Sequence, residues 1–274
     1  MTVIIVSSDS LSTAAHIAEQ TARGLNYRCV GREILGELGK RYGVSEGKLH
    51  RTLDELPSLF GVSARAHAQY LAYIEEAVLA RLSEDGAVCH GLAAHLYVRG
   101  ISHALKVRVR ADRSEIIRET MRQKGVSPEK AAKIAKHEEA LRSQWSIEIY
   151  RSDETAPSLN DLVINLSRVA PEEAVRMIVE SSSHPRFRPT TYSVKCINDM
   201  ALASRVRVVL LAHFPDVVVE ADGVSVVVQT AAVPREKEKR VEAIEKLTKS
   251  VAGVGHVEVH VVNDTVRQAA ESFR

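Results

Sequence analysis

Residues 2–25 read TVIIVSSDSLSTAAHIAEQTARGL, and this stretch decides the fold. Residues 3–6 are an unbroken β-branched run, which is typical of a strand buried on both faces of a parallel sheet. Alanines then recur at helical spacing: Ala14, Ala15, Ala18 and Ala22. Ser12 or Thr13 can cap the start of this helix. We therefore predict a strand, a polar loop and a helix, and in doubly wound folds such a junction faces a ligand.

The predicted loop is Ser7-Ser8-Asp9-Ser10-Leu11-Ser12-Thr13, and its residues are our candidates for binding the phosphates of a nucleotide. A phosphate-binding loop normally offers glycine N–H groups and a lysine. Here no glycine lies between Thr2 and Arg23, and no lysine comes before Lys40. The Asp9 carboxylate repels a polyphosphate unless a metal ion intervenes. We therefore expect a degenerate phosphate-binding loop, and an ordinary strand-to-helix turn is the competing interpretation.

Composition narrows the possible functions. A chain of 274 residues forms one or two domains, and a net charge of +2 does not indicate nucleic-acid binding. Cys29, Cys89 and Cys196 are widely spaced, which is typical of buried thiols and not of a disulfide framework or a zinc site. No apolar run reaches membrane-spanning length and no targeting segment is recognisable. We therefore expect a cytoplasmic protein with no metal site of its own.

The order of the predicted elements indicates a three-layer α/β domain with a mainly parallel sheet. Further buried strands are predicted at residues 87–91 and 161–166. Residues 105–111 (LKVRVRA) alternate apolar and basic side chains, as in a strand near a sheet edge or beside a polar site. Helices are predicted between the strands, including 64–82 and the highly charged, solvated helix 129–145.

The pattern changes after a polar, proline-containing segment at residues 181–189. The elements predicted beyond it are a helix at 199–214, strands at 217–220 and 224–230, a helix at 235–251 and a strand at 257–262. The two strands meet at Asp222-Gly223, a strong hairpin signal. This order describes a small α+β domain (αββαβ). We divide the chain into a first domain at 1–183, a linker at 184–190 and a second domain at 191–274.

Three stretches of the first domain carry a resemblance to a known family: residues 18–35 (AEQTARGLNYRCVGREIL), 88–127 and 160–168 (NDLVINLSR). They resemble the cytidylate kinase-like family, relatives of the nucleoside monophosphate kinases with a P-loop-kinase-like fold, and the match runs over about residues 3–179. Two positions depart from the family pattern. Gly31 stands where the family has an aspartate, and Leu92 stands where it has an arginine.

The resemblance implies ATP-dependent phosphorylation of a nucleoside monophosphate, with magnesium accompanying the ATP. By resemblance, Arg32 lies where the acceptor nucleotide binds, Arg113 and Arg118 follow the third strand, and Arg142 lies in a lid helix. The last three are our catalytic candidates, because phosphoryl transfer depends on positioning and charge neutralisation. The degenerate loop predicts weakened activity, since a missing lysine removes transition-state stabilisation. The alternative is a non-catalytic sensor or scaffold for a nucleotide or another small anionic ligand.

The second domain carries two turn motifs, Asp222-Gly223-Val224 and residues 251–257 (VAGVGHV). On these motifs it resembles a BON domain, a module linked with membrane or ligand attachment in other proteins. Residues 235–240 (REKEKR) mix both charges, which is typical of a soluble face and not of a patch for anionic lipid. We therefore expect this domain to bind a protein partner or a second copy of the chain, without a membrane span.

Overall fold

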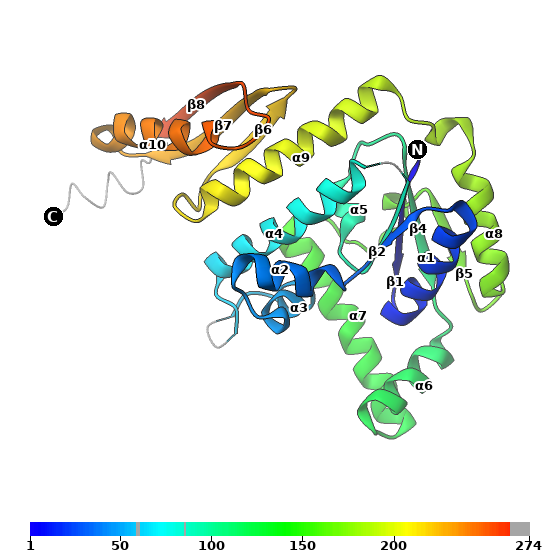
Figure 1. Cartoon of the computed structure of the whole chain (residues 1–274). Helices are drawn as coiled ribbons and strands as arrows, with labels where there is room; N and C mark the ends of the chain where they lie inside the picture. The colour runs from blue at the N-terminus through cyan, green and yellow to red at the C-terminus, as the bar shows by residue number, and fades with distance from the viewer. Residues whose placement is uncertain (59–60, 85, 264–274) are drawn as a thin grey trace.

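The computed structural model of the chain describes residues 1–58, 61–84 and 86–263 (Figure 1). The first elements are β1 Val3–Ser8, α1 Leu11–Leu25, β2 Arg28–Val30, α2 Ile34–Tyr42, α3 Glu46–Asp54, α4 Ala64–Leu82, β3 Ala87–His90 and α5 Ala94–Tyr97. Next come β4 Ala104–Arg110, α6 Arg113–Lys124, α7 Pro128–Tyr150, η1 Pro157–Leu159, β5 Leu162–Asn165, α8 Pro171–Ser182 and η2 Pro185–Phe187. The last are α9 Thr191–Leu211, β6 Val218–Asp222, β7 Ser225–Ala232, η3 Pro234–Glu236, α10 Lys237–Lys249 and β8 His256–Asn263. Residues 264–274 of the predicted second domain lie outside the described residues.

Five strands form one sheet in the order β2-β3-β1-β4-β5, and every neighbouring pair is parallel. This sheet confirms the predicted α/β class. β4 lies between β1 and β5, so LKVRVRA is not an edge strand, and its Arg108 is in register with Ser7 of β1. β5 is one of the two edge strands and exposes Val163, so the prediction of a buried strand there was wrong.

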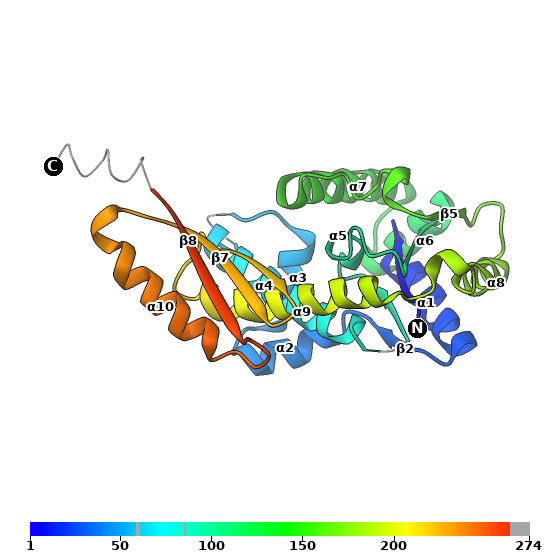
Figure 2. The ribbon, with the colours of Figure 1, turned by 90° about the horizontal axis from the view of Figure 1, so that it is seen from above.

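Helices cover both faces of this sheet, so the domain has three layers, as Figures 1 and 2 show. A hydrophobic core lies on each face of the sheet. Because successive strand residues face opposite ways, β1 places Ile4 and Val6 in the core beneath α1 and α8. It places Val3 and Ile5 in the core beneath α2, α3, α4 and α5. Burial on both faces explains why this strand is a continuous apolar run.

Two predicted helix starts were wrong. The N-cap of α1 is Ser10 and not Ser12 or Thr13, because the Ser10 side chain accepts a hydrogen bond from the Thr13 backbone N–H. α9 begins at Thr191, well before the predicted start at residue 199, and Thr190 caps it. The helix therefore begins directly after the segment predicted as a linker.

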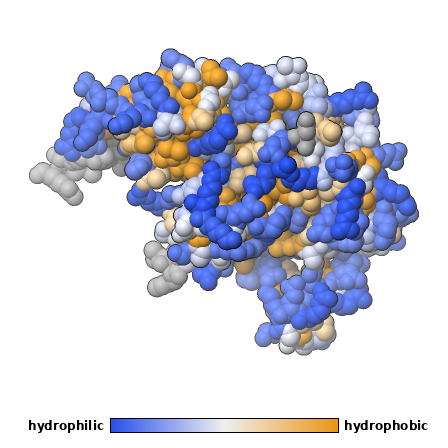
Figure 3. Space-filling model, in the orientation of Figure 1, coloured by the Kyte–Doolittle hydropathy of each residue, from blue (hydrophilic) through white to orange (hydrophobic). Residues whose placement is uncertain are grey.

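Helices α6 and α7 pack against each other and project at the bottom of Figure 1. The space-filling view shows mainly hydrophilic side chains over this projection (Figure 3), as predicted for the charged helix. At the other end of α7, Trp145 is buried and its Nε1–H donates to the Thr52 carbonyl oxygen at 3.0 Å. The helix is therefore anchored on α3 near its end, while its start extends into solvent.

The C-terminal elements form a second sheet in the order β6-β7-β8. β6 and β7 are antiparallel and meet at Asp222-Gly223, where Gly223 has a φ of 60°, a conformation that favours glycine. β7 and β8 are parallel, and α9 and α10 pack on this sheet. A separate hydrophobic core contains Val226, Val228 and Ile244.

Helix α9 belongs to both halves of the molecule. Its Ile197 and Ala201 lie in the core beside α4, whereas Leu202 and Val206 lie in the core of the second sheet. Figures 1 and 2 both show it running between the two sheets. The two halves therefore share a continuous helix through their hydrophobic cores.

None of the helices in the described part of the chain is long and apolar enough to cross a membrane. The three cysteines are free; Cys89 is buried, but Cys29 and Cys196 are only partly buried, so the prediction of buried thiols holds for one of the three. Burial raises the pKa of the Cys29 thiol to about 11, with smaller contributions from Glu33 and Glu19.

Candidate functional site

The loop after β1 satisfies its polar groups internally. Ser10 Oγ accepts a hydrogen bond from the Thr13 backbone N–H at 3.2 Å, and Ser8 Oγ accepts one from the Ser10 backbone N–H at 3.2 Å. The Ser10 hydroxyl also lies 3.0 Å from Ser12 Oγ and donates to Glu119 Oε2 of α6 at 3.1 Å. These hydroxyls are therefore engaged by the loop itself and by α6.

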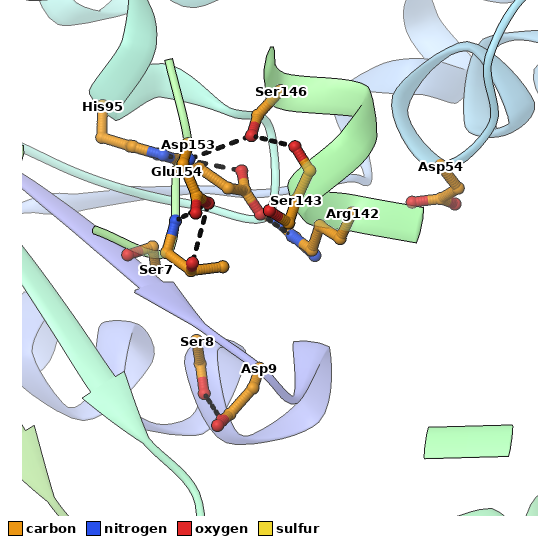
Figure 4. A network of polar contacts seen from close by, with 12 residues as sticks. Ser7, Ser8, Asp9, Asp54, His95, Arg142, Ser143, Ser146, Asp153 and Glu154 are labelled. Carbon is orange, nitrogen blue, oxygen red and sulfur yellow. Dashed lines mark hydrogen bonds and ion pairs between the residues drawn. The ribbon is translucent and has the colours of Figure 1, made fainter. Parts of the chain in front are cut away.

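Asp9 attaches the same loop to a neighbouring strand. Its Oδ1 accepts a hydrogen bond from the Ala111 backbone N–H at 2.8 Å, directly after β4, and another from Ser8 Oγ at 3.2 Å. Figure 4 shows Ser8 and Asp9 side by side, away from the cluster around Glu154. The carboxylate that repels a polyphosphate is also a structural link between β1 and β4.

A cavity of about 660 Å³ lies beside this loop, within the size range of small-molecule sites. Of the predicted site residues, it brings together Ser12, Thr13 and Arg118. Arg118 forms an ion pair with Glu115 on the same helix, and both side chains are exposed. Arg113, the first residue of α6, is exposed and does not line this cavity.

Arg32 lies on the other side of the loop, against the turn after β3. Its Nε donates to the Gly91 carbonyl oxygen at 2.9 Å. Its two terminal nitrogens form a bidentate pair with Asp54, at 2.7 and 2.5 Å. The guanidinium of the predicted acceptor-binding residue is therefore already neutralised by a carboxylate from α3.

A second cavity, of about 10 Å³, has room for about one water molecule. It lies beneath the loop and brings together three predicted loop residues, Ser7, Ser8 and Leu11, with Arg142 of α7. His95 of α5 also lines it. Seven of the predicted site residues therefore line one or the other cavity, whereas Asp9, Ser10, Arg32 and Arg113 line neither.

Glu154 connects Arg142 with His95 (Figure 4). Arg142 Nε donates to Glu154 Oε1, and His95 Nε2 lies 3.6 Å from Glu154 Oε2. The Glu154 backbone N–H donates to Ser146 Oγ at 2.9 Å, which fixes this segment on α7. Burial lowers the pKa of His95 to about 4, although Glu154 acts in the opposite direction, so the ring is neutral at neutral pH.

The sequence interpretation missed Arg108, His95 and Glu154 as members of this group. Arg108 is 5% exposed, and burial lowers the pKa of its guanidinium although Glu154 and Asp9 raise it. The signal was present in LKVRVRA, where an arginine alternates with apolar residues. It was ambiguous, because the same pattern describes an edge strand that faces solvent.

Gly31 and Leu92, the two positions that we expected to depart from the family pattern, are both closely packed. A Cβ at Gly31 would lie 2.4 Å from His90 Nε2, so the His90 ring fills the place of a side chain at residue 31. Leu92 is fully buried within the hydrophobic core.

Several solved structures are similar to this chain, and they include the following three. An uncharacterized protein from Eubacterium ventriosum has a TM-score of 0.49 at 16% identity, over 67% of this chain and 100% of that chain. Shikimate kinase from Bacteroides thetaiotaomicron has a TM-score of 0.42 at 11% identity, over 66% and 97%. Dephospho-CoA kinase from Campylobacter jejuni has a TM-score of 0.34 at 16% identity, over 67% and 98%.

No curated protein matches the chain. The model of the cytidylate kinase-like family matches residues 3–168. These residues include the whole parallel sheet, the loop after β1 and all the residues that line the two cavities except Pro171. This match covers more than half of the sequence. The chain therefore belongs to the cytidylate kinase-like family.

Proposed function

We propose that this chain binds a nucleotide at the carboxyl ends of β1 and β4 and phosphorylates a nucleoside monophosphate with ATP far more slowly than a kinase with a complete phosphate-binding loop. The observation that carries the proposal is the loop after β1. It keeps the position of a phosphate-binding loop but has no lysine or glycine, and Ser10 and Asp9 are engaged in internal hydrogen bonds. Family membership supports a kinase-like function of this general kind.

The cavity of about 660 Å³ is the proposed site for ATP. Arg118 and Arg122 line it and offer positive charge to phosphates, and the Ser12 and Thr13 side chains line it from α1. Within the described residues no three acidic, histidine or cysteine side chains are placed to hold a metal ion. Magnesium in this proposal therefore arrives bound to the ATP phosphates and keeps several water molecules as its other ligands.

In this proposal the arginines supply the positive charge that stabilises the phosphates. Arg142 of α7 lies at the loop, and Arg32, our proposed contact to the acceptor nucleotide, lies at the turn after β3. Arg113 stays a proposed contact. Without a loop lysine, only the arginines and the magnesium bound to ATP stabilise the transition-state charge, and we expect a rate lower by orders of magnitude.

Titration calorimetry of the full chain with ATP, with and without magnesium, tests the nucleotide site. We expect weak binding that Arg118→Ala abolishes. Lys124→Ala is the matched control, because Lys124 lies on the same helix, pairs with Glu138 and does not line the cavity. Micromolar, magnesium-dependent binding would contradict the proposed weakness, and equal losses in both variants would contradict the site.

A second function, signalling of the bound state through the C-terminal part, is favoured by α9. We propose that residues 191–263 act as a BON-like unit that binds a protein partner or a second copy of the chain. Arg207 of α9 pairs with Glu75 of α4 at 2.8 Å, and Arg65 donates to the Ala212 carbonyl oxygen at 2.9 Å. A movement of α4 would therefore be transmitted to this unit through these contacts with α9.

Limited proteolysis tests this arrangement. We expect the first cut at residues 184–190, as between two domains, and we expect the two fragments to stay associated because α9 buries Ile197 and Ala201 against the first core. Sedimentation of the cut protein with and without ATP gives the readout. Fragments that separate at once would contradict coupling through α9, and first cleavage within 87–111 would contradict the domain boundary.

A further inference from the structure

The cluster around Glu154 contains three buried polar atoms without a hydrogen-bond partner: His95 Nε2, Arg108 NH1 and Glu154 Oε2. The three residues are 4%, 5% and 1% exposed. A buried polar atom that forms no hydrogen bond destabilises the folded state, so three of them together require an explanation. The cluster adjoins the second cavity, which His95, Arg142 and Ser7 line beneath the loop after β1.

The two guanidinium groups of this cluster are satisfied unequally. Arg142 is partly exposed and pairs with Glu154, whereas Arg108 forms no ion pair with a carboxylate of the described residues within 4.0 Å. Glu154 and Asp9 act on Arg108 only from a distance, and both raise its pKa. A buried guanidinium group without an ion pair is costly unless an anion binds it.

We propose that Arg108 and Arg142 form a binding site for a phosphate group, and that the side chain of Glu154 occupies this site when no ligand is bound. The 10 Å³ cavity is too small for a phosphate, so binding requires Glu154 to leave. Its departure frees the carboxylate's volume and the Arg142 guanidinium at the same time. Glu154 therefore competes with the ligand as an internal anion.

The position of Glu154 in the chain permits this movement. It lies between the end of α7 and η1, outside any helix or strand. One backbone hydrogen bond, from its N–H to Ser146 Oγ, holds it on α7. The inference rests on the proposed function for the identity of the ligand, because the phosphate of an acceptor nucleotide is a group of this chemistry.

Calorimetric titration of the full chain with inorganic phosphate, at constant ionic strength, tests the inference. Glu154→Ala removes both the charge and the bulk, and we expect phosphate affinity to rise at least about tenfold. Glu154→Gln removes only the charge and should give a smaller gain. Glu154→Asp keeps the charge and should bind phosphate as weakly as the unmodified chain. Melting temperature with and without phosphate shows that each variant is folded and whether phosphate restores lost stability.

Arginine variants in the Glu154→Gln background locate the site. Arg108→Met should abolish the gain in phosphate affinity. Arg110→Met is the matched control, since Arg110 lies two residues further along β4 and is exposed, and it should leave the gain intact. Equal phosphate affinity in all the Glu154 variants would overturn the inference, because a single buried water then explains the three unpartnered atoms. A loss with Arg110→Met as large as with Arg108→Met would also overturn it.

The inference and the proposed function can fail separately. Phosphate binding that depends on Arg108 and Glu154, without ATP binding in any variant, would support the inference and contradict the proposed nucleotide site. ATP binding that depends on Arg118, without any effect of Glu154 on phosphate, would do the reverse.

Discussion

The loop after β1 and the cluster around Glu154 both contribute residues to the small second cavity, but they differ in how their polar groups are satisfied. In the loop, Asp9 and Ser10 have partners in the loop itself, at the end of β4 and on α6. In the cluster, Arg108 and Glu154 each keep a buried atom without a partner. The polar groups of the loop are hydrogen-bonded, whereas the cluster keeps buried polar atoms that are not.

The largest expected effect concerns His95 in the cluster. Burial lowers its pKa from 6.5 to about 4, with Glu154 raising it and Arg142, Arg108 and Arg99 lowering it further. Between these values the unfolded chain binds a proton that the folded chain does not, so stability falls as the pH drops through this window. The full loss is roughly 3 kcal/mol, at about 1.4 kcal/mol for each pKa unit.

Urea unfolding between about pH 7 and about pH 4 measures this effect. His95→Gln removes the titrating group, so its free energy of unfolding should depend less steeply on pH than that of the unmodified chain. His67, His90 and His103 also have lowered pKa values and contribute to both curves, so the difference between the curves isolates His95. Parallel curves would show that the cluster is not the origin of acid sensitivity.

Sequence periodicity predicted the parallel sheet, the helix pattern and the hairpin at Asp222-Gly223, because these depend on local propensity and burial. It did not predict the true start of α9, because this part of the helix is stabilised by long-range packing of Ile197 against the first core. It also did not place Ser10 as the N-cap, because Ser12 and Thr13 satisfy the same local rule equally well.

The candidate site was predicted in part. Ser12, Thr13 and Arg118 were predicted as site residues, and they line the larger cavity together. It gave no reason to group Arg108 with Glu154, because these residues are far apart in the chain and meet only through the sheet order. Whether a charged strand residue faces solvent or a buried cleft depends on the neighbouring strand, which periodicity alone does not identify.

The second expected effect concerns Asp9 in the loop. Its carboxylate accepts hydrogen bonds from the Ala111 backbone N–H and the Ser8 hydroxyl, and bonds of this charge-assisted kind contribute about 2 kcal/mol. Asp9→Ala should therefore lower the free energy of unfolding by about that amount in urea titrations. Asp9→Asn keeps an oxygen acceptor and should cost less. Unchanged stability together with tighter ATP binding in Asp9→Ala would show that this carboxylate only blocks phosphate and does not support the loop.

The smallest expected effect concerns Ser10. Its hydroxyl caps α1 by accepting from the Thr13 backbone N–H at 3.2 Å, and loss of such a cap costs about 1 kcal/mol. Ser10→Ala should therefore destabilise the chain by about this amount in urea titrations. Ser12→Ala is the matched control, because Ser12 is exposed and caps no backbone N–H; its stability should change by no more than about 0.5 kcal/mol. If both variants lost stability equally, the Ser10 and Ser12 hydroxyls would stabilise the loop together, as one hydrogen-bond network, and the cap alone would not explain the loss. If neither changed, the cap would contribute nothing, and the Ser10 hydroxyl would be available to a ligand after all.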